Sequence, residues 1–405
     1  MPDVRPLYGL RYQPAAVGDL GSVVAPPFDV ISPEKQAQLH AASPYNVIRL
    51  EYGLDEPGLA DRYQRAAATL RGWQRDGILQ TETKASYYLY EQEFEHEGTT
   101  YRRRSIMGKV RLEPLETGAI RPHEHTMSGP KEDRLRLLKA CRTQVSPILS
   151  LYRSDGGTAI DLCLQAVDGR SPYMATDATG QMHRLWVIDQ TAIVEQLKWA
   201  LSAYALYIAD GHHRYETALA YQAERRSVAT VWTGEEPENF VLMALTAADD
   251  PGLLILPIHR LVQPVSVPED LRQALWSAFE VAEVESGAPH EGPALTELLE
   301  RLHEENRDAA VLGALGVEAK HPLLLILRDR ASVAQRMPGE HSDAWRRLDV
   351  NVLQYGILEP LLGIDLETVR AGSNVAFTES AAEAVEAVEA GRVPLAFLVN
   401  PTRPE

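Results

Sequence analysis

Residues 205–219 read Ala-Leu-Tyr-Ile-Ala-Asp-Gly-His-His-Arg-Tyr-Glu-Thr-Ala-Leu, and they decide how this part of the chain folds. The first five residues form a short apolar run, which is typical of a buried strand. Asp210-Gly211 is a turn signal, and the residues after it place apolar side chains at helical spacing. The sequence therefore predicts a strand, a sharp glycine turn and a helix whose first turn carries two histidines and Arg214.

This turn has the properties of an anion site. A helix N-terminus exposes backbone N–H groups, and the helix dipole adds positive potential there. His212, His213 and Arg214 can donate hydrogen bonds at the same place, and the planar fork of Arg214 fits two phosphate oxygens. The turn is therefore predicted to bind phosphate groups. A second interpretation stays open, in which Gly211 only supplies a positive φ and Asp210 only caps the helix.

The chain alternates strand-like and helix-like segments along its whole length, which predicts a mixed α/β fold of the α+β class. At 405 residues it is too long for a single small core, so two domains are expected. The run Gly-Glu-Glu-Pro-Glu at 234–238 is polar and turn-prone. We therefore expect an N-terminal domain at 1–235 and a C-terminal α/β domain at 236–405.

Periodicity gives the expected elements within these domains. Apolar spacing predicts helices near 58–75, 158–167, 191–203, 269–279, 293–305 and 350–362. Alternating or continuous apolar runs predict strands near 87–94, 101–112, 147–152, 240–246, 253–262, 309–314, 323–328, 375–377 and 395–399. The first two strands are expected to form a hairpin through His96-Glu97-Gly98-Thr99.

Composition excludes several classes of function. The net charge of −17 disfavours nucleic-acid binding, because the one dense basic run, Arg102-Arg103-Arg104, lies in the expected hairpin. No apolar run reaches about 18 residues, so neither a membrane span nor a membrane partner is expected. The N-terminus lacks the pattern of a signal peptide, and the two cysteines, Cys141 and Cys163, fit a reducing cytoplasm and exclude a thiolate zinc site.

Asp29 is a candidate catalytic carboxylate. It lies in Ala-Pro-Pro-Phe-Asp-Val-Ile-Ser at 25–32, where two prolines stiffen the backbone before it. A carboxylate held in this way suits a general base or a metal ligand. The alternative is that Asp29 only caps a turn before Ser32.

A second candidate segment is rich in groups that bind anions. His123 and His125 would share one face of an extended chain, although they lack the spacing of a helical zinc motif. Lys131 and Arg134 follow near the start of an expected helix, where positive charge opposes the helix dipole. An anionic ligand would relieve this cost, whereas an exposed basic helix face would explain the same pattern.

With these residues in hand, the chain resembles the uncharacterised family called domain of unknown function 1015. The shared words are Ala-Pro-Pro-Phe-Asp-Val-Ile-Ser at 25–32, Ser-Pro-Tyr-Asn at 43–46, His-Glu-His-Thr at 123–126, Lys-Glu-Asp-Arg at 131–134, Ala-Asp-Gly-His-His-Arg at 209–214, Leu-Pro-Ile-His-Arg at 256–260 and Leu-Glu-Pro-Leu-Leu-Gly at 358–363.

The turn at 210–214 also resembles the nucleotide site of the ParB/sulfiredoxin superfamily, which includes CTP-binding partition proteins, sulfiredoxins and free-serine kinases. The resemblance implies a ParB/sulfiredoxin-like core in which this turn holds nucleotide phosphates. Sulfiredoxins carry a cysteine where this chain has His212, so sulfinic-acid repair is not expected. In the kinases an acidic residue of an N-terminal segment is the base, and Asp29 is the candidate by position.

These observations lead to an expected phosphotransferase, similar to a free-serine kinase. It would move a phosphoryl group from ATP or ADP to a small hydroxylated metabolite, with Mg²⁺ bridging the phosphates. Asp210, Gly211, His212, His213, Arg214, Lys131 and Arg134 are the expected cofactor-binding residues, and Asp29, His123 and His125 are the expected catalytic residues. Two alternatives stay open: a phosphohydrolase acting on a small phosphorylated metabolite, and a non-catalytic nucleotide-binding regulatory protein. The sequence names neither metal ligands nor an oligomeric state.

Overall fold

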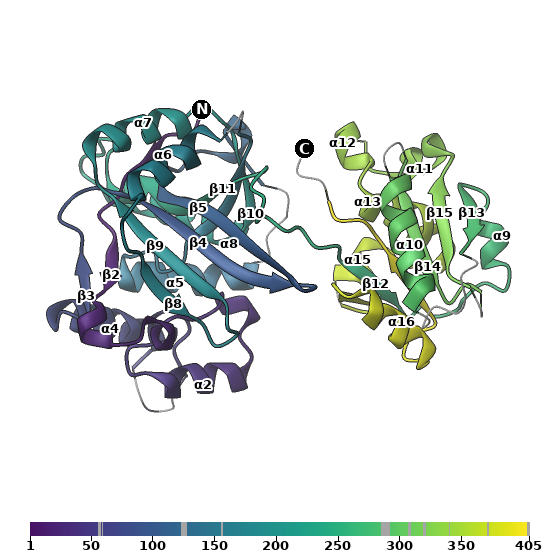
Figure 1. The fold of residues 1–405 in the computed structure, drawn as a ribbon, viewed down its shortest axis with the longest axis horizontal. Coiled ribbons are helices and arrows are strands. Elements are labelled where there is room, and N and C mark those ends of the chain that lie inside the picture. The colour runs from purple at the N-terminus through teal and green to yellow at the C-terminus, as the bar shows by residue number, and fades with distance from the viewer. Residues whose placement is uncertain are drawn as a thin grey trace. The chain divides into compact units, whose positions relative to one another are not determined.

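The computed structural model describes residues 1–55, 58, 60–122, 128–154, 157–284, 292–306, 309–318, 321–339, 341–370 and 372–402. The chain forms two compact units, Met1–Leu254 and Ile255–Glu405 (Figure 1). Each unit has its own sheet and its own apolar core, and helices and strands occur in both. The fold is therefore mixed α/β, which confirms the expected α+β class. Among the described residues, no helix is both long enough and apolar enough to cross a membrane.

Unit 1 is built on a nine-stranded mixed sheet with the order β6-β10-β7-β11-β5-β4-β9-β8, and β1 pairs with β5 beside this path. The pairs β6/β10 and β7/β11 are parallel, and the other neighbours are antiparallel. The strands are β1 Val4–Arg5, β4 Tyr87–His96, β5 Thr99–Arg111, β6 Ile120–Arg121, β7 Ile148–Tyr152, β8 Tyr173–Thr176, β9 Met182–Ile188, β10 Leu206–Asp210 and β11 Phe240–Ala247. A separate pair consists of β2 Leu10–Tyr12 and β3 Leu79–Thr81.

The expected hairpin at residues 96–99 is confirmed. His96 pairs with Thr99, which leaves Glu97 and Gly98 as a two-residue loop between β4 and β5. Both loop residues have positive φ, 50° at Glu97 and 74° at Gly98. Two consecutive positive φ angles are typical of the hairpin turn whose twist matches that of the flanking strands.

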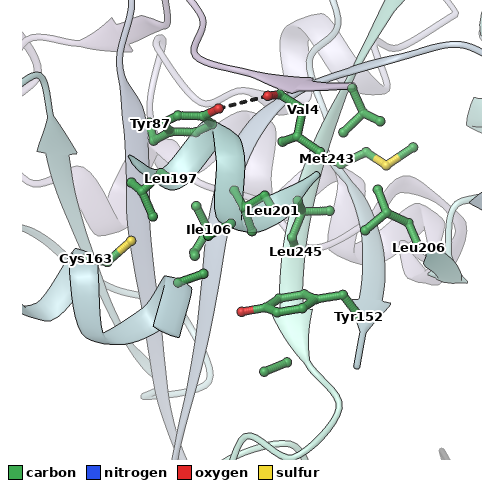
Figure 2. Packing of buried hydrophobic residues seen from close by; sticks show 14 of the residues in the cluster. Val4, Tyr87, Ile106, Tyr152, Cys163, Leu197, Leu201, Leu206, Met243 and Leu245 are labelled. Atoms are coloured by element: carbon green, nitrogen blue, oxygen red, sulfur yellow. Dashed lines mark hydrogen bonds between the residues drawn. The ribbon is translucent and has the colours of Figure 1, made fainter. Parts of the chain in front are cut away.

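Helices α6 Thr158–Val167 and α7 Thr191–Leu201 cover one face of the sheet. Figure 2 shows Cys163 of α6 and Leu197 of α7 next to Ile106 of β5, within the main apolar cluster. The hydroxyl of buried Tyr87 donates to the Val4 carbonyl at 2.9 Å, which ties β4 to the N-terminal strand β1. A buried hydroxyl with a partner avoids the cost of an unsatisfied polar group.

A second helical layer lies on the other side of this sheet, as α4 and α5 do in Figure 1. Helix α5 packs against both α4 and α8. The elements here are α1 Pro14–Val17, η1 Leu20–Val23, η2 Phe28–Val30, α2 Pro33–Ala42, α3 Ile48–Glu51, α4 Arg62–Arg75, α5 Ser128–Cys141 and α8 His212–Val228. Two short 3₁₀ turns complete the unit, η3 Leu115–Thr117 and η4 Pro237–Asn239.

The units divide between Leu254 and Ile255, later than the expected boundary between residues 235 and 236. The physical reason is β11, which lies between β7 and β5 in the middle of the first sheet. The polar run at 234–238 is therefore a turn within unit 1. Residues 253–258 also form no strand, although a strand was expected over 253–262, and β12 begins only at His259.

Unit 2 contains a six-stranded sheet in which every described pair is antiparallel, with the order β13-β15-β14-β17-β12-β16. The strands are β12 His259–Val262, β13 Phe279–Glu283, β14 Val311–Leu315, β15 Leu323–Leu327, β16 Val375–Thr378 and β17 Leu395–Leu398. A helix was expected over 269–279, but α9 covers only Leu271–Leu275. The expected end of this helix is wrong, because Phe279 begins the strand β13. The alternating run Phe-Glu-Val-Ala-Glu favours the strand.

Both faces of this second sheet are buried. Leu325 and Phe397 belong to the cluster on one face, and Leu324 and Leu398 belong to the cluster on the other. Continuous apolar runs such as Leu-Leu-Leu-Ile-Leu are the sequence pattern of strands covered on both sides. The helices of this unit are α9, α10 Gly292–Glu305, α11 Arg330–Arg336, α12 Asp343–Arg346, α13 Asp349–Leu353, a π-helical turn η5 Gln354–Leu358, α14 Glu359–Leu362, α15 Leu366–Arg370 and α16 Ala381–Glu389.

Candidate functional site at the start of α8

The structure confirms the strand, glycine turn and helix expected around residue 211. Strand β10 ends at Asp210, and Gly211 is the N-cap of α8 with φ 96° and ψ 29°. The register between β10 and β7 shifts between Ile208 and Asp210, so a β-bulge precedes the turn. A bulge next to a turn re-aims the chain, and bulges are frequent beside functional sites.

Two features favour glycine at position 211. Its positive φ lies in the region that side chains rarely adopt. A Cβ built on it would lie 2.9 Å from Nε of Arg214, because that side chain folds back over the turn. The backbone at Gly211 and the position of the Arg214 guanidinium are therefore coupled.

Arg214 is mostly buried and is held by two acceptors. It donates to the carbonyl of Pro147 and to the carboxylate of Asp210, whose own side chain is about half exposed. The guanidinium also borders a small cavity of about 50 Å³. This volume suits a few water molecules, not a nucleotide. A phosphate ligand of the turn would therefore lie outside this small cavity.

The other residues of the first turn of α8 differ in exposure. His212 is buried, and His213 is half-buried. Tyr215 is fully buried one residue beyond Arg214, and its hydroxyl donates to the carbonyl of Glu113 at 2.8 Å while accepting from the Glu113 N–H at 3.0 Å. These two hydrogen bonds fix the start of α8 to the segment that follows β5.

Helix α5 brings the 131–134 segment to the side of α8. Nζ of Lys131 lies 2.6 Å from a carboxylate oxygen of Glu216. The hydroxyl of Thr217 donates to the Lys131 carbonyl at 3.4 Å. The structure thus places Lys131 within one helical turn of Arg214 along α8, although the two are far apart in the sequence.

Arg134 is a buried clamp between elements. Its guanidinium donates to the side chain and to the carbonyl of Glu51, each at 3.0 Å, and it also pairs with Asp133. It stacks on the ring of Phe28 with 3.9 Å to the ring centroid. Ser146 donates to the same Glu51 carboxylate at 2.7 Å. Arg134 therefore joins α5, α3 and η2.

Charges around Asp133 stabilise the same network. Burial opposes ionisation of this carboxyl, but Arg134, the Tyr63 hydroxyl and Arg62 together lower its pKa. The negative charge near the start of α5, which the sequence suggested a ligand would supply, comes from protein carboxylates. Glu51 pairs with Arg134, and Glu216 pairs with Lys131.

Asp29 lies in the short 3₁₀ turn η2, and its side chain is exposed. Its neighbour Phe28 contacts Arg134, so the segment 25–32 lies next to the network of α5. The N-cap of the following helix α2 is Ser32, whose hydroxyl accepts from the N–H of Lys35 at 3.2 Å. The cap of α2 is thus supplied without Asp29.

His123 and His125 lie outside the described residues. The elements on either side of them are described: β6 ends at Arg121, and α5 begins at Ser128. Strands β6 and β10 are parallel neighbours, so their carboxyl ends meet at the same edge of the sheet. Among the described residues, no group of three or more His, Cys, Asp or Glu side chains is arranged to hold a metal ion.

Sequence reasoning missed a cavity of unit 1 with a volume of about 970 Å³. It borders the face of the sheet opposite α6 and α7. One signal of it lies in the alternation of β4 and β5, which points Tyr88, Tyr90, Met107 and Lys109 to this side. Lys109, near the end of the central strand β5, is unusual there, because a lysine is rarely placed against an apolar wall.

The comparisons with known proteins identify a family and nothing more specific. No curated protein and no solved structure matches the chain. A family model described as "Protein of unknown function (DUF1015)" matches residues 4–351, which is most of the chain. The segments 25–32, 131–134 and 209–214 all lie within this match. The chain therefore belongs to the DUF1015 family.

Proposed function

We propose that this protein transfers a phosphoryl group from ATP or ADP to a small hydroxylated metabolite, with free serine as the representative acceptor. The observation that carries the proposal is the start of α8. There a positive-φ glycine, an arginine and the N-terminus of a 17-residue helix occupy one turn. Such a turn offers N–H groups, a helix dipole and a guanidinium to the same anion.

Asp210 has a specific place in this proposal. An exposed carboxylate beside a phosphate would repel it, unless a cation lies between them. Mg²⁺ prefers oxygen ligands and binds through one or two carboxylates together with substrate phosphates. Asp210 would therefore hold Mg²⁺, and Arg214, on release from Asp210, would contact the phosphate oxygens.

The resemblance of the turn to the ParB/sulfiredoxin superfamily supports a core of that type around residues 210–214. On this proposal, His212 and His213 complete the phosphate turn. Lys131 contributes positive charge from the adjacent helix α5, and Arg134 holds α5 and η2 in place for binding. Asp29 orients or deprotonates the acceptor hydroxyl, and His123 and His125 contact the transferred group. The protein would act without nucleic-acid or membrane partners.

Nucleotide binding is tested first, by calorimetric titration of the full chain with ATP and ADP in the presence of Mg²⁺. Arg214→Ala should weaken binding by roughly 1.5–3 kcal/mol, the usual loss for a charge-assisted hydrogen bond. Arg226→Ala is the matched control, because it removes an exposed arginine from the other end of the same helix. Equal affinities of wild type and a folded Arg214→Ala variant would refute the phosphate site.

Turnover is tested second, with serine as acceptor and with phosphoserine as the reverse substrate. Asp29→Asn should keep nucleotide binding and lower turnover by about 10²-fold or more, the scale of general-base loss. Glu34→Gln, which changes a nearby exposed carboxylate, is the control. Phosphate release from phosphoserine without nucleotide would indicate a phosphohydrolase, and nucleotide binding without turnover would indicate a regulatory protein.

A further inference from the structure

The cavity of about 970 Å³ lies within unit 1, between the open face of the nine-stranded sheet and the N-terminal and helical segments that cover it. Its size is at the upper end of the roughly 300–1,000 Å³ range of small-molecule sites. Most of the wall is apolar, and it draws on strands, helices and loops. Representative apolar residues of the wall are Leu7, Leu20, Val24, Met107, Leu185 and Leu242.

Three tyrosines of the wall, Tyr12, Tyr88 and Tyr90, already have partners for their hydroxyls. The Tyr88 hydroxyl accepts from the Gly9 N–H at 3.0 Å, and the Tyr12 hydroxyl donates to the Tyr45 carbonyl at 2.7 Å. The Tyr90 hydroxyl lies 2.7 Å from Nδ1 of His183. The hydrogen bonds of these three hydroxyls are therefore already made within the protein.

Most charged side chains of the wall are also neutralised by the protein. Arg11 pairs with Glu82, Arg184 pairs with Glu91 and Glu93, and Glu238 pairs with Arg225. Glu235 pairs with Arg5 and Arg111. Within the described part of the chain, the charged residues of the wall that lack an ion pair are Lys109 and Arg142, and Arg142 is exposed.

Lys109 belongs to a cluster with an excess of positive charge. Register places Arg5 of β1 and Leu242 of β11 beside Lys109 of β5. The cationic groups of Arg5, Lys109 and Arg111 lie 5.0, 4.5 and 4.6 Å from the centroid of the Phe240 ring. Two carboxylates, Asp3 and Glu235, face these three cations. The three cations and two carboxylates of this cluster together carry one net positive charge, in a protein whose net charge is −17.

The environment of Lys109 favours an anion beside it. Burial and the neighbouring Arg5 lower the pKa of Lys109, while Glu235 and Asp3 oppose the shift. A cation that is partly withdrawn from water and lacks a carboxylate partner gains most from a ligand that supplies one.

We propose that this cavity binds an amphipathic monoanion, a carboxylic acid with an aliphatic or aromatic body, whose carboxylate pairs with Lys109. The body of the ligand lies against the apolar wall, where burial of apolar area drives binding. A nucleotide fits this site poorly, because its phosphates carry several negative charges, whereas Lys109 is the half-buried cation that lacks an ion pair among the described residues of the wall. The proposal is independent of the turn at 210–214.

The test is calorimetric titration of the full chain with decanoate and, as an uncharged partner of equal length, 1-decanol. Wild type should bind decanoate at a single site. Lys109→Met should weaken decanoate binding by about tenfold or more and leave 1-decanol binding unchanged, because only the charge is removed. Lys109→Arg should retain most of the affinity. Lys198→Met, which removes an exposed lysine of α7, is the matched control.

A cavity-filling variant tests the apolar body separately. Leu185→Trp should abolish binding of both decanoate and 1-decanol, with circular dichroism used to verify the fold of each variant. Absence of saturable decanoate binding to wild type would overturn the proposal. So would equal decanoate affinities of wild type and a folded Lys109→Met variant. Full displacement of decanoate by ATP with Mg²⁺, with the same dependence on Lys109, would assign the cavity to a nucleotide and overturn it as well.

Discussion

Gly211 carries two constraints at once, a φ of 96° and the close approach of the Arg214 guanidinium. We therefore expect Gly211→Ala to lower the unfolding free energy by roughly 1–3 kcal/mol, the cost of a residue held in a sparsely populated backbone region. The added methyl group should also displace Arg214, so nucleotide affinity should fall together with stability. Thermal unfolding and titration with ATP and Mg²⁺ measure the two effects.

Gly180→Ala is the control for backbone strain alone. Gly180 has a φ of 86°, and a Cβ built there has no neighbouring atom within 4 Å. This variant should lose stability to a similar degree while keeping full nucleotide affinity. If Gly211→Ala also kept full affinity, the coupling between the glycine and Arg214 would have no functional consequence.

His259 provides a prediction about pH. It is fully buried in β12, and its Nδ1 accepts from the Val399 N–H at 3.2 Å. Burial, followed by the charge of Arg260, lowers the pKa of His259 from 6.5 to about 4. The folded state thus favours the neutral ring. The stability that this provides is complete above pH 6.5 and is lost as the pH falls from 6.5 towards 4.

His259→Asn keeps a hydrogen-bond acceptor and removes the titrating ring. Denaturant unfolding measured at several pH values should show a smaller loss of stability between pH 6.5 and 4 for this variant than for wild type. His303→Asn, at an exposed position of α10, serves as the comparison. An unchanged pH dependence in a folded His259→Asn variant would contradict the assignment.

At the scale of elements, Arg134 links helix α5 to α3 and η2 through a buried pair with Glu51. Removing one partner of such a pair leaves the other charge buried and unpaired, which typically costs 3–5 kcal/mol. Arg134→Met should therefore lower the unfolding free energy by about this amount. Arg136→Met is the control, because it removes a half-exposed arginine of the same helix, for which about 0–1 kcal/mol is expected.

Denaturant unfolding and nucleotide titration of the two variants together distinguish a structural role of Arg134 from a ligand-binding role. A purely ligand-binding role predicts weaker nucleotide binding with little loss of stability. A structural role predicts a large loss of unfolding free energy, with little loss of nucleotide affinity when the titration is performed below the unfolding temperature. Both roles act at the same site, so the informative quantity is the loss of unfolding free energy relative to the loss of nucleotide affinity.

The sequence predicted elements well where the signal is local. As expected, α6 begins at Thr158 and the Asp210-Gly211 turn leads into α8, because apolar spacing and glycine are read within a few residues. The N-cap of α8 is Gly211, not Asp210 as the alternative interpretation had it. Partners could not be predicted in this way. Arg134 meets Glu51 across 83 residues and Lys131 meets Glu216 across 85, so a basic helix start alone could not reveal that protein carboxylates neutralise it.

The same distinction explains the cavity that sequence reasoning missed. The position of Lys109 within an alternating strand is visible in the sequence. Its neighbours Arg5 and Leu242 come from strands that are about 100 residues earlier and 130 residues later in the chain, and pairing alone brings them together. A cavity wall to which β4, β5, β9 and β11 all contribute leaves no single motif.

For the whole molecule, the two sheets share no strand, and the chain divides at Leu254. A fragment of residues 1–254 contains the complete nine-stranded sheet and should fold alone with one cooperative thermal transition. A fragment of residues 1–235 ends at the polar turn and lacks β11. Because β11 pairs with β5 on one side and β7 on the other, this shorter fragment should lose the centre of the sheet and fail to fold. Circular dichroism and thermal melts of both fragments measure the difference, and equal stability of the two would contradict the division after β11.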